Sequence, residues 1–460
     1  MYLDRDFFTA ALEGVHIRGE IPQDPHFCID SRKLQSGEIF IALKGHTTDG
    51  HNFVKHALEA GASGVIVEKS QESCLSSISS SILQNKCIII VPNTYKALLT
   101  LASEWRKKFS CPIFAITGSV GKTGTKEVLM HILKTAGRRY IATPGTQNTV
   151  LGVALTLLDM RPHHEGAIFE VGISKRGEMA RIAELLKPTH ALITTIGHSH
   201  MEGLGSLQDI ALEKRDIFKY FKEDSIGILC GDQPLLSTLS YAHPIIKFGS
   251  KTINQIQARK VHVKESSLEF VLKLYQKKYK VTLPSYHIGY LYNVLGAVSA
   301  AHLLGIPHET IINAIHMPVR IPGRFELCTL KDNKGILIND CYNASPESMK
   351  AALIAFEKIA CKGIKMAILG DMLELGMTWR LWHRQLGRLL LKVPSLKHVI
   401  FVGEHVKLAL NTVPVGISVE HALTWRDALE KLHSKLNKDS VILVKASRGI
   451  GLDNLVNAVR

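Results

Sequence analysis

The feature that most constrains this chain is a glycine-rich turn that separates an apolar run from an amphipathic helical pattern. Residues 112–116 read P-I-F-A-I, residues 117–123 read T-G-S-V-G-K-T, and the apolar spacing that follows is helical. Glycines let backbone amides curl around an anion, and the next helix directs its positive end at the same point. The chain is therefore expected to contain a strand–turn–helix unit that binds phosphate.

Residue types within this turn suggest separate roles. Lys122 is expected to reach the β- and γ-phosphates of a nucleoside triphosphate, and the Thr123 hydroxyl to bind Mg²⁺. Ile116 stands where the longer motif has its first glycine, so this is the short form G-x-x-G-K-T. The phosphates would be cradled by the backbone of Gly118, Ser119, Val120 and Gly121.

Strand-like and helix-like segments alternate along the rest of the chain, which indicates α/β architecture with mostly parallel sheets. We expect helices at residues 53–62, 94–109 and 291–305. We expect strands at residues 39–43, 64–68, 87–91, 167–172, 190–197, 225–230, 335–340, 365–371, 398–403 and 440–447. A length of 460 residues suggests about three domains. Proline and glycine near residues 110–112 and 321–323 divide the chain into predicted domains 1–110, 111–322 and 323–460.

Charge and cysteine usage narrow the class of protein. There are 56 Lys and Arg against 41 Asp and Glu, a net charge of +15 that attracts anions. The basic residues are spread out and no RNA-binding signature accompanies them, so we expect no nucleic-acid partner. No apolar run is long enough to predict a membrane span, and the N-terminus lacks the apolar core of a secretory signal. The eight cysteines form no C-x-x-C pair and several lie in apolar strand-like runs, which indicates a reducing cytoplasm.

Several separate stretches carry a resemblance to a known family. The short P-loop resembles that of the Mur ligases, the ATP-dependent amide-forming enzymes of peptidoglycan synthesis, and of the related folylpolyglutamate synthetases. Residues 30–53, 321–349 and 368–376, followed by His383, resemble most closely the Mur branch that adds D-alanyl-D-alanine. The D-N-P-R signature of the diamino-acid-adding branch is absent. The resemblance extends over essentially the whole chain and is more specific than any single motif.

This resemblance implies an architecture and a reaction. The expected domains are an N-terminal one for the UDP-substrate, a central P-loop ATPase and a C-terminal Rossmann-like domain for the incoming dipeptide. The substrates would be UDP-N-acetylmuramoyl-tripeptide and D-alanyl-D-alanine, with ATP and Mg²⁺ as cofactors. ATP would convert the tripeptide carboxylate into an acyl phosphate that the dipeptide amine attacks. We expect a cytoplasmic monomer.

The family pattern also implies residues for catalysis and metal binding. Glu170 ends a predicted strand and matches a Mg²⁺ ligand, and His200 matches a metal-associated histidine. Lys214 matches a lysine that CO₂ carbamylates, which would turn a cation into an anionic metal ligand. Asn148 matches an asparagine near the transferred phosphate. Lys122, Lys214, His200 and Asn148 are therefore the predicted catalytic residues.

Three further sets of residues are implied by the same pattern. The nucleotide would be contacted by Asn293, Arg324, Asp340 and Tyr342. The UDP part of the substrate would be held by Ser31, Arg32, Lys44 and Gly45. The dipeptide would be received by Asp371, Glu374, His383, Ser447 and Arg448.

The chain also departs from the family pattern, and other interpretations stay open. The departures are Thr149, Val150, Thr195, Gly289 and Tyr290. One alternative is another Mur ligase that adds an amino acid, and a second is a folylpolyglutamate synthetase-like ligase. A P-loop ATPase that binds nucleic acid would need a strand ending in paired acids, which is not seen. A non-catalytic homologue is the last, because the departures remove groups expected at the site.

Overall fold

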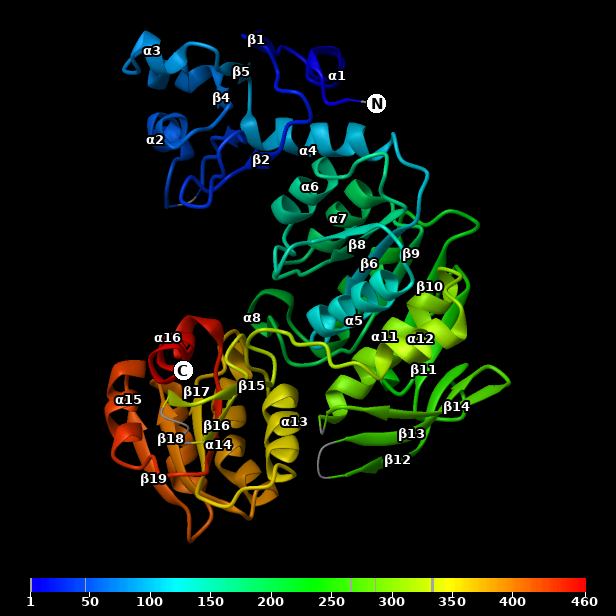
Figure 1. The fold of residues 1–460 in the computed structure, drawn as a ribbon, viewed down its shortest axis with the longest axis vertical. Coiled ribbons are helices and arrows are strands. Elements are labelled where there is room, and N and C mark those ends of the chain that lie inside the picture. The colour runs from blue at the N-terminus through cyan, green and yellow to red at the C-terminus, as the bar shows by residue number, and fades with distance from the viewer. Residues whose placement is uncertain (1, 46, 265–266, 286, 332–334) are drawn as a thin grey trace. The chain divides into compact units, whose positions relative to one another are not determined.

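The computed structural model describes residues 2–45, 47–264, 267–285, 287–331 and 335–460 (Figure 1). Its contacts divide the chain into two compact units. The first comprises Met1–Phe114, Arg139–Val171 and Arg181–Pro188, and the second comprises Ala115–Arg138, Gly172–Ala180 and Thr189–Arg460. Each unit is described by itself.

The N-terminal sheet has five strands in the order β1-β5-β4-β3-β2 among the described residues. They are β1 (His16–Arg18), β2 (Phe27–Cys28), β3 (Ile39–Ile41), β4 (Gly64–Glu68) and β5 (Cys87–Val91). All neighbours pair in parallel except β1, which is antiparallel to β5. Every residue of β3 and β5 is buried, as apolar strands of a covered parallel sheet should be.

Helices of several lengths connect these strands. They are α1 (Arg5–Ala11), α2 (Val54–Glu59), α3 (Ser80–Leu83), α4 (Thr94–Arg106) and the 3₁₀ helices η1 (Gly50–Phe53) and η2 (Lys69–Leu75). The Asn93 side chain caps α4 by accepting a hydrogen bond from the Lys96 amide, and Trp105 near its end is buried.

The second sheet carries the P-loop, and its strand order is β14-β13-β12-β11-β10-β9-β6-β8-β7. The strands are β6 (Ile113–Thr117), β7 (Tyr140–Ala142), β8 (Gly166–Glu170), β9 (His190–Ile193), β10 (Ile226–Cys230), β11 (Ile245–Gly249), β12 (Ile256–Val263), β13 (Leu268–Leu274) and β14 (Lys277–Leu283). β9 to β12 pair in parallel, and β12, β13 and β14 form an antiparallel extension.

The helices that follow these strands position the site. They are α5 (Lys122–Thr135), α6 (Val150–Leu158), α7 (Glu178–Leu186), α8 (Met201–Leu204), α9 (Leu207–Arg215), η3 (Asp216–Phe218), α10 (Pro234–Ser237), α11 (Ile288–Leu303) and α12 (His308–Ile315). α5, which begins at the P-loop lysine, packs against α11 and α12. This packing holds the start of α5 at the carboxyl end of β6, where α/β proteins bind ligands.

The third sheet has six strands in the order β15-β16-β20-β17-β18-β19. They are β15 (Glu326–Thr329), β16 (Gly335–Asn339), β17 (Lys365–Gly370), β18 (Leu396–Val402), β19 (Ser418–Ala422) and β20 (Ser440–Lys445). All neighbours are parallel except β15 with β16. Two apolar clusters lie against this sheet. One involves α13 (Pro346–Glu357) and α14 (Trp379–Leu389), and the other involves α15 (Trp425–His433) and α16 (Leu452–Val459) (Figure 1).

The predicted fold class is confirmed, since three mostly parallel sheets are present, each with helices between its strands. Each predicted strand is found, most of them within two residues of the expected bounds. The antiparallel strands β12–β14 were not predicted. The domain limits at residues 110 and 322 stay predictions. Among the described residues, no helix has the length and apolar character needed to span a membrane.

Candidate nucleotide-binding and catalytic site

The predicted P-loop joins β6 to α5 in a conformation that needs its glycines. Gly118 and Gly121 have φ values of 143° and 94°, a region that residues with a side chain rarely adopt. A Cβ on Gly118 would lie 1.9 Å from the Thr194 hydroxyl oxygen. Lys122 begins α5, and its Nζ donates a hydrogen bond to the Gly118 carbonyl at 2.9 Å. The lysine therefore lies folded over the turn it was predicted to serve.

Two threonines that follow β9 fix the backbone of this turn. The Thr194 hydroxyl donates to the Val120 carbonyl at 2.6 Å. The Thr195 hydroxyl donates to the same carbonyl at 3.0 Å, and its carbonyl accepts from the Ser119 amide at 2.7 Å. Thr195, a departure from the family pattern, thus supports the P-loop directly. Sequence analysis missed Thr194, whose signal was a hydroxyl at the carboxyl end of a strand.

A buried hydroxyl at the start of α5 has the character of a metal ligand. The side chain of Thr123 is buried, and its Oγ1 has no hydrogen-bond partner among the described residues. Leaving a buried hydroxyl unpaired costs free energy unless a ligand supplies the missing partner. This atom fits the predicted Mg²⁺ role. Thr125, two residues further into the helix, is also unpaired, so the position of Thr123 in the motif distinguishes the two.

Asn293 extends from α11 toward the same turn. A Cβ on Gly121 would lie 2.6 Å from the Asn293 Oδ1, and one on Gly124 would lie 2.1 Å from its Nδ2. Any larger residue at either glycine would collide with the amide. The structure therefore brings Asn293 to the P-loop, and its contact with the nucleotide stays a prediction.

Lys214 lies in the last turn of α9 and is 1% exposed. Burial lowers the pKa of its amine well below the ordinary value, and the positive charge of Lys122 lowers it further. An amine with a depressed pKa is neutral more often, and the neutral form is the nucleophile that reacts with CO₂. This environment suits the predicted carbamylation.

Glu170 and Asn148 belong to the other compact unit and contact each other. The Asn148 Nδ2 donates to the Glu170 Oε1 at 2.8 Å, and the Glu170 amide donates to the Thr143 hydroxyl at 2.8 Å. Glu170 is 1% exposed, and its Oε2 has no hydrogen-bond partner among the described residues. A buried carboxylate with one oxygen free of hydrogen bonds fits a Mg²⁺ ligand.

His200 lies in the left-handed region with φ of 58°, directly before α8. Its Nδ1 is 2.5 Å from the Oε2 of Glu374. The structure therefore joins a predicted metal-associated residue to a predicted dipeptide residue. That contact holds the pKa of Glu374 below its ordinary value, although burial opposes the shift.

Predicted nucleotide residues from the start of the third segment gather around one aromatic ring. The Arg324 guanidinium lies 4.1 Å from the centre of the Tyr342 ring, and the Arg448 guanidinium lies 5.2 Å from it. Asp340 forms a buried ion pair with Lys445 at 2.8 Å, and its Oδ1 accepts from an amide. Arg324 was predicted to bind the γ-phosphate and Arg448 to bind the dipeptide. The structure places both guanidinium groups near the Tyr342 ring.

Three of the predicted dipeptide residues are engaged in the scaffold. Asp371 accepts hydrogen bonds from the amides of residues 404–406, with distances of 3.0, 3.2 and 2.7 Å. Burial lowers the pKa of His383. Its Nε2 accepts from the Met372 amide and its Nδ1 lies 2.7 Å from the Trp379 carbonyl. The Ser447 hydroxyl accepts from the Leu373 amide at 2.9 Å.

The predicted UDP residues lie at the surface of the N-terminal segment. Arg32 makes a two-pronged contact with Asp30, at 2.8 and 2.9 Å, yet its side chain is 85% exposed. Lys44 pairs with Asp49 in an isolated β-bridge, and the Gly45 amide donates to the Thr48 carbonyl. The Arg32 guanidinium is thus open to solvent on one side, while Ser31 precedes it in the same turn.

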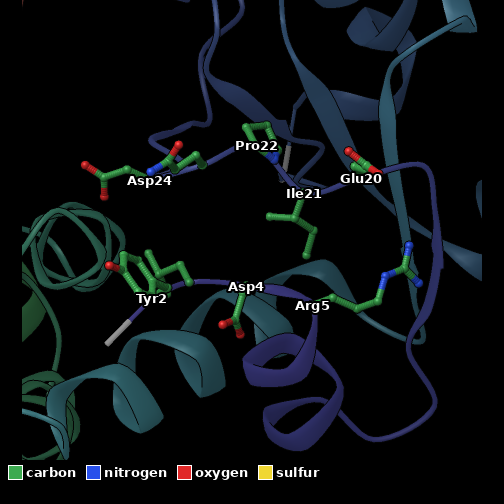
Figure 2. Close-up of a pocket in the computed structure, with 9 residues that line it drawn as sticks. Tyr2, Asp4, Arg5, Glu20, Ile21, Pro22 and Asp24 are labelled. Atoms are coloured by element: carbon green, nitrogen blue, oxygen red, sulfur yellow. The ribbon is translucent and has the colours of Figure 1, made fainter.

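A cavity of about 440 Å³ lies elsewhere in the N-terminal segment, between residues 2–5 and 20–24 (Figure 2). In Figure 2 the Ile21 side chain points into it, while the Arg5 guanidinium points away. The Arg5 guanidinium donates to the Gly19 carbonyl at 2.6 Å, and the Asp4 carboxylate caps α1. Its charged groups serve the local fold and do not converge, so this cavity is not the predicted site.

Within the part of the chain that the structure describes, no three His, Cys, Asp or Glu side chains form a group that could hold a metal ion. The predicted metal ligands are not such a group. In addition to Glu170 and His200, the prediction includes the hydroxyl of Thr123 and a carbamate on Lys214. The buried, unpaired oxygens of Thr123 and Glu170 are the observations that support it.

Comparisons with known proteins cover all three segments. Residues 26–103 match the model of the Mur ligase family, catalytic domain, residues 116–301 the Mur ligase middle domain, and residues 323–448 the Mur ligase, glutamate ligase domain. A UDP-N-acetylmuramoyl-tripeptide–D-alanyl-D-alanine ligase of Bacillus subtilis (strain 168) is 34% identical, over 93% of this chain and 91% of its own. One of the same name from Treponema pallidum (strain Nichols) is 32% identical, over 100% of this chain and 99% of its own.

Solved structures agree with these relatives. A crystal structure of MurF from Acinetobacter baumannii superposes with a TM-score of 0.84 and 27% identity, over 100% of this chain and 98% of that one. MurF from Thermotoga maritima, in complex with ADP, gives a TM-score of 0.78 and 26% identity, over 94% of this chain and 96% of that one. The chain belongs to the Mur ligase family, in its MurF group of ATP-dependent, amide-bond-forming ligases.

Proposed function

We propose that this protein joins D-alanyl-D-alanine to UDP-N-acetylmuramoyl-tripeptide, with conversion of ATP to ADP and phosphate. The observation that carries the proposal is the likeness of nearly the full chain to ligases of that name. The P-loop, with Lys122 over a turn whose glycines cannot be replaced without collision, supports the use of ATP.

The chemistry has two steps. A terminal carboxylate oxygen of the tripeptide attacks the γ-phosphorus of ATP, and the bond to the bridging oxygen breaks to release ADP. The dipeptide amine then attacks the acyl-phosphate carbon, the bond to the phosphate oxygen breaks, and the nitrogen loses a proton. The first step brings two anions together, so positive charge is essential.

Residues of this chain would supply that charge and hold the reactants. Lys122 and the start of α5 would face the phosphates, and Arg324 would bind the γ-phosphate in a bidentate manner. Mg²⁺ would neutralise charge on the triphosphate. Its ligands would be Thr123, Glu170 and a carbamate on Lys214, with His200 close to the metal. Asn148 would orient Glu170 through the hydrogen bond that it donates to Oε1.

Carbamylation of Lys214 can be tested separately from turnover. Protein equilibrated with ¹³C-labelled bicarbonate should give a carbamate carbon resonance that is missing from Lys214→Ala. The exposed Lys219→Ala serves as the control and should keep the resonance. A spectrum with no difference between wild type and Lys214→Ala would contradict carbamylation, whatever the activity.

The remaining assignments complete the proposal. The UDP part would be bound by Ser31, Arg32, Lys44 and Gly45, and the dipeptide by Arg448 and Glu374. Asn293 and Tyr342 would contact the adenine. The ion pair between Asp340 and Lys445 would hold the backbone next to Tyr342 in place. All eight cysteines are unpaired thiols, which supports a reducing cytoplasm, and we expect a monomer by sedimentation.

A coupled assay tests the proposal directly. ADP release should require both UDP-N-acetylmuramoyl-tripeptide and D-alanyl-D-alanine, and mass spectrometry should detect the pentapeptide product. Replacing the dipeptide by a single amino acid tests the alternative of an amino-acid-adding ligase. Absence of product with both substrates, ATP and magnesium would overturn the proposal and favour a non-catalytic homologue.

A further inference from the structure

One short loop of the second unit, residues 197–200, is held at two points by acids from far along the chain. It follows β9 and leads into α8. The His198 Nδ1 is 2.5 Å from the Glu347 Oε1, and the His200 Nδ1 is 2.5 Å from the Glu374 Oε2. Sequence analysis gave His200 a role and left His198 and Glu347 without one.

The contact of His198 with Glu347 is built into the backbone. The His198 amide also donates to the Glu347 Oε1, at 3.1 Å. A Cβ on Gly197 would lie 2.9 to 3.1 Å from the carboxyl atoms of Glu347, so the carboxylate lies directly against the Gly197 backbone and a side chain at this position would push it away. The His198 ring also stands edge-on to the Trp382 ring, with 4.6 Å between centres. An imidazole, an amide and a glycine thus converge on one carboxylate.

This contact links two parts of the proposed ATP site. On one side, the Ser119 hydroxyl of the P-loop donates to the Gly197 carbonyl at 3.0 Å. On the other, Glu347 lies in the first turn of α13, five residues after Tyr342. A series of contacts therefore connects the P-loop to the segment of Tyr342: from Ser119 to Gly197, and from His198 to Glu347.

We propose that His198 and Glu347 are positioning residues that fasten the Tyr342 segment to the P-loop when ATP binds. Within the described part of the chain, the side chains of His198 and Glu347 hydrogen-bond to each other and not to the P-loop, so they act through Gly197 and through the start of α13. Without the pair, a smaller fraction of the molecules has the arrangement that can bind ATP. The apparent affinity for ATP falls in proportion to that fraction. This inference rests on the ligase function proposed above.

The kinetic test separates positioning from simple stabilisation. His198→Ala and Glu347→Gln should each raise the KM for ATP about tenfold, with kcat at saturating ATP and the melting temperature unchanged. The double variant should be no worse than either single variant, because the two residues act as one unit. His163→Ala, which removes an exposed imidazole of the other unit, is the control and should match wild type.

A spectroscopic readout checks the contact without turnover. An imidazole beside an indole alters the emission of the indole, so His198→Ala should change the Trp382 fluorescence, isolated by subtracting Trp382→Phe. Unchanged Trp382 emission, an unchanged KM for ATP, or a loss of kcat with a lower melting temperature would each overturn the proposal. An inactive wild type would instead contradict the ligase function, while the fluorescence test would still apply.

Discussion

The P-loop region and the loops around Asp371 use polar side chains in opposite ways. At the P-loop and at the end of β8, Thr123 and Glu170 are buried and each keeps one oxygen without a hydrogen bond among the described residues. Around Asp371, the carboxylate, His383 and Ser447 are equally buried, but their polar atoms bind nearby backbone amides and carbonyls. Both sets match motifs of one family.

This difference teaches how to interpret a motif. A buried polar atom without a partner carries an energetic cost that a bound ligand can remove. A buried polar atom that is fully hydrogen-bonded stabilises the fold and has little left to offer a substrate. We therefore expect substitutions in the first region to lower activity at constant stability, and substitutions in the second to lower stability at nearly constant KM.

The largest effect is expected for Lys122→Ala. Removing the cation over the P-loop should lower kcat by about 10³-fold, because charge on the phosphoryl group would lose its stabilisation. The melting temperature should change little. Steady-state ADP release and thermal unfolding measure the two quantities. Lys134→Ala, in the last turn of the same helix, is the control, and a Lys122→Ala enzyme that retains turnover would remove the P-loop from the mechanism.

The next largest effect is expected for Asp371→Ala, in free energy of unfolding. It leaves three backbone amides, those of residues 404–406, without an acceptor, which should cost about 3 kcal/mol. Urea unfolding at pH 7 measures the loss, and the exposed Asp453→Ala should lose less than about 1 kcal/mol. A large rise in the KM for D-alanyl-D-alanine without loss of stability would show instead that Asp371 contacts the dipeptide.

A smaller effect is expected for Thr123→Val, which removes one hydroxyl and keeps the shape of the side chain. Activity should fall about 30-fold, and the fall should be steepest at low Mg²⁺, because the hydroxyl is the proposed ligand. Stability should stay within about 1 kcal/mol, since no hydrogen bond is lost within the described chain. Thr125→Val is a stringent control: its hydroxyl is also buried and unpaired, so equal losses for both would refute the metal role of Thr123.

The sequence predicted the positions of the parallel strands and the P-loop because both depend on local signals. Apolar runs such as residues 87–91 and the glycines at 118 and 121 require no knowledge of distant contacts. The strands β12–β14 were missed although β13 alternates strictly between buried and partly exposed residues, because β12 and β14 on either side of it carry long exposed basic stretches. The contact of His198 with Glu347 joins residues 149 positions apart, and no local pattern reports such a pairing. For the same reason the sequence does not show that Asp371 accepts hydrogen bonds from the amides of residues 404–406.

The smallest effect tests whether a carboxylate that accepts several hydrogen bonds stabilises the fold outside the Asp371 region as well. Asp232, which follows β10, is half-buried, and burial raises its pKa. Hydrogen bonds from the amide and hydroxyl of Ser250, the Lys251 amide and Tyr292 outweigh burial and lower the pKa to about 2.

Because the folded pKa of Asp232 lies below the unfolded value of 3.8, the carboxylate adds stability that is fully present above about pH 4. That stability is lost as the pH falls toward 2. After solvent screening at this half-buried site, the contribution should be about 1 kcal/mol. Urea unfolding from pH 5 to pH 2.5 should show a shallower decline for Asp232→Asn than for wild type. Identical slopes would mean that the hydrogen bonds seen at Asp232 do not favour its ionised form, and the comparison between saturated and unsaturated carboxylates would then hold only around Asp371.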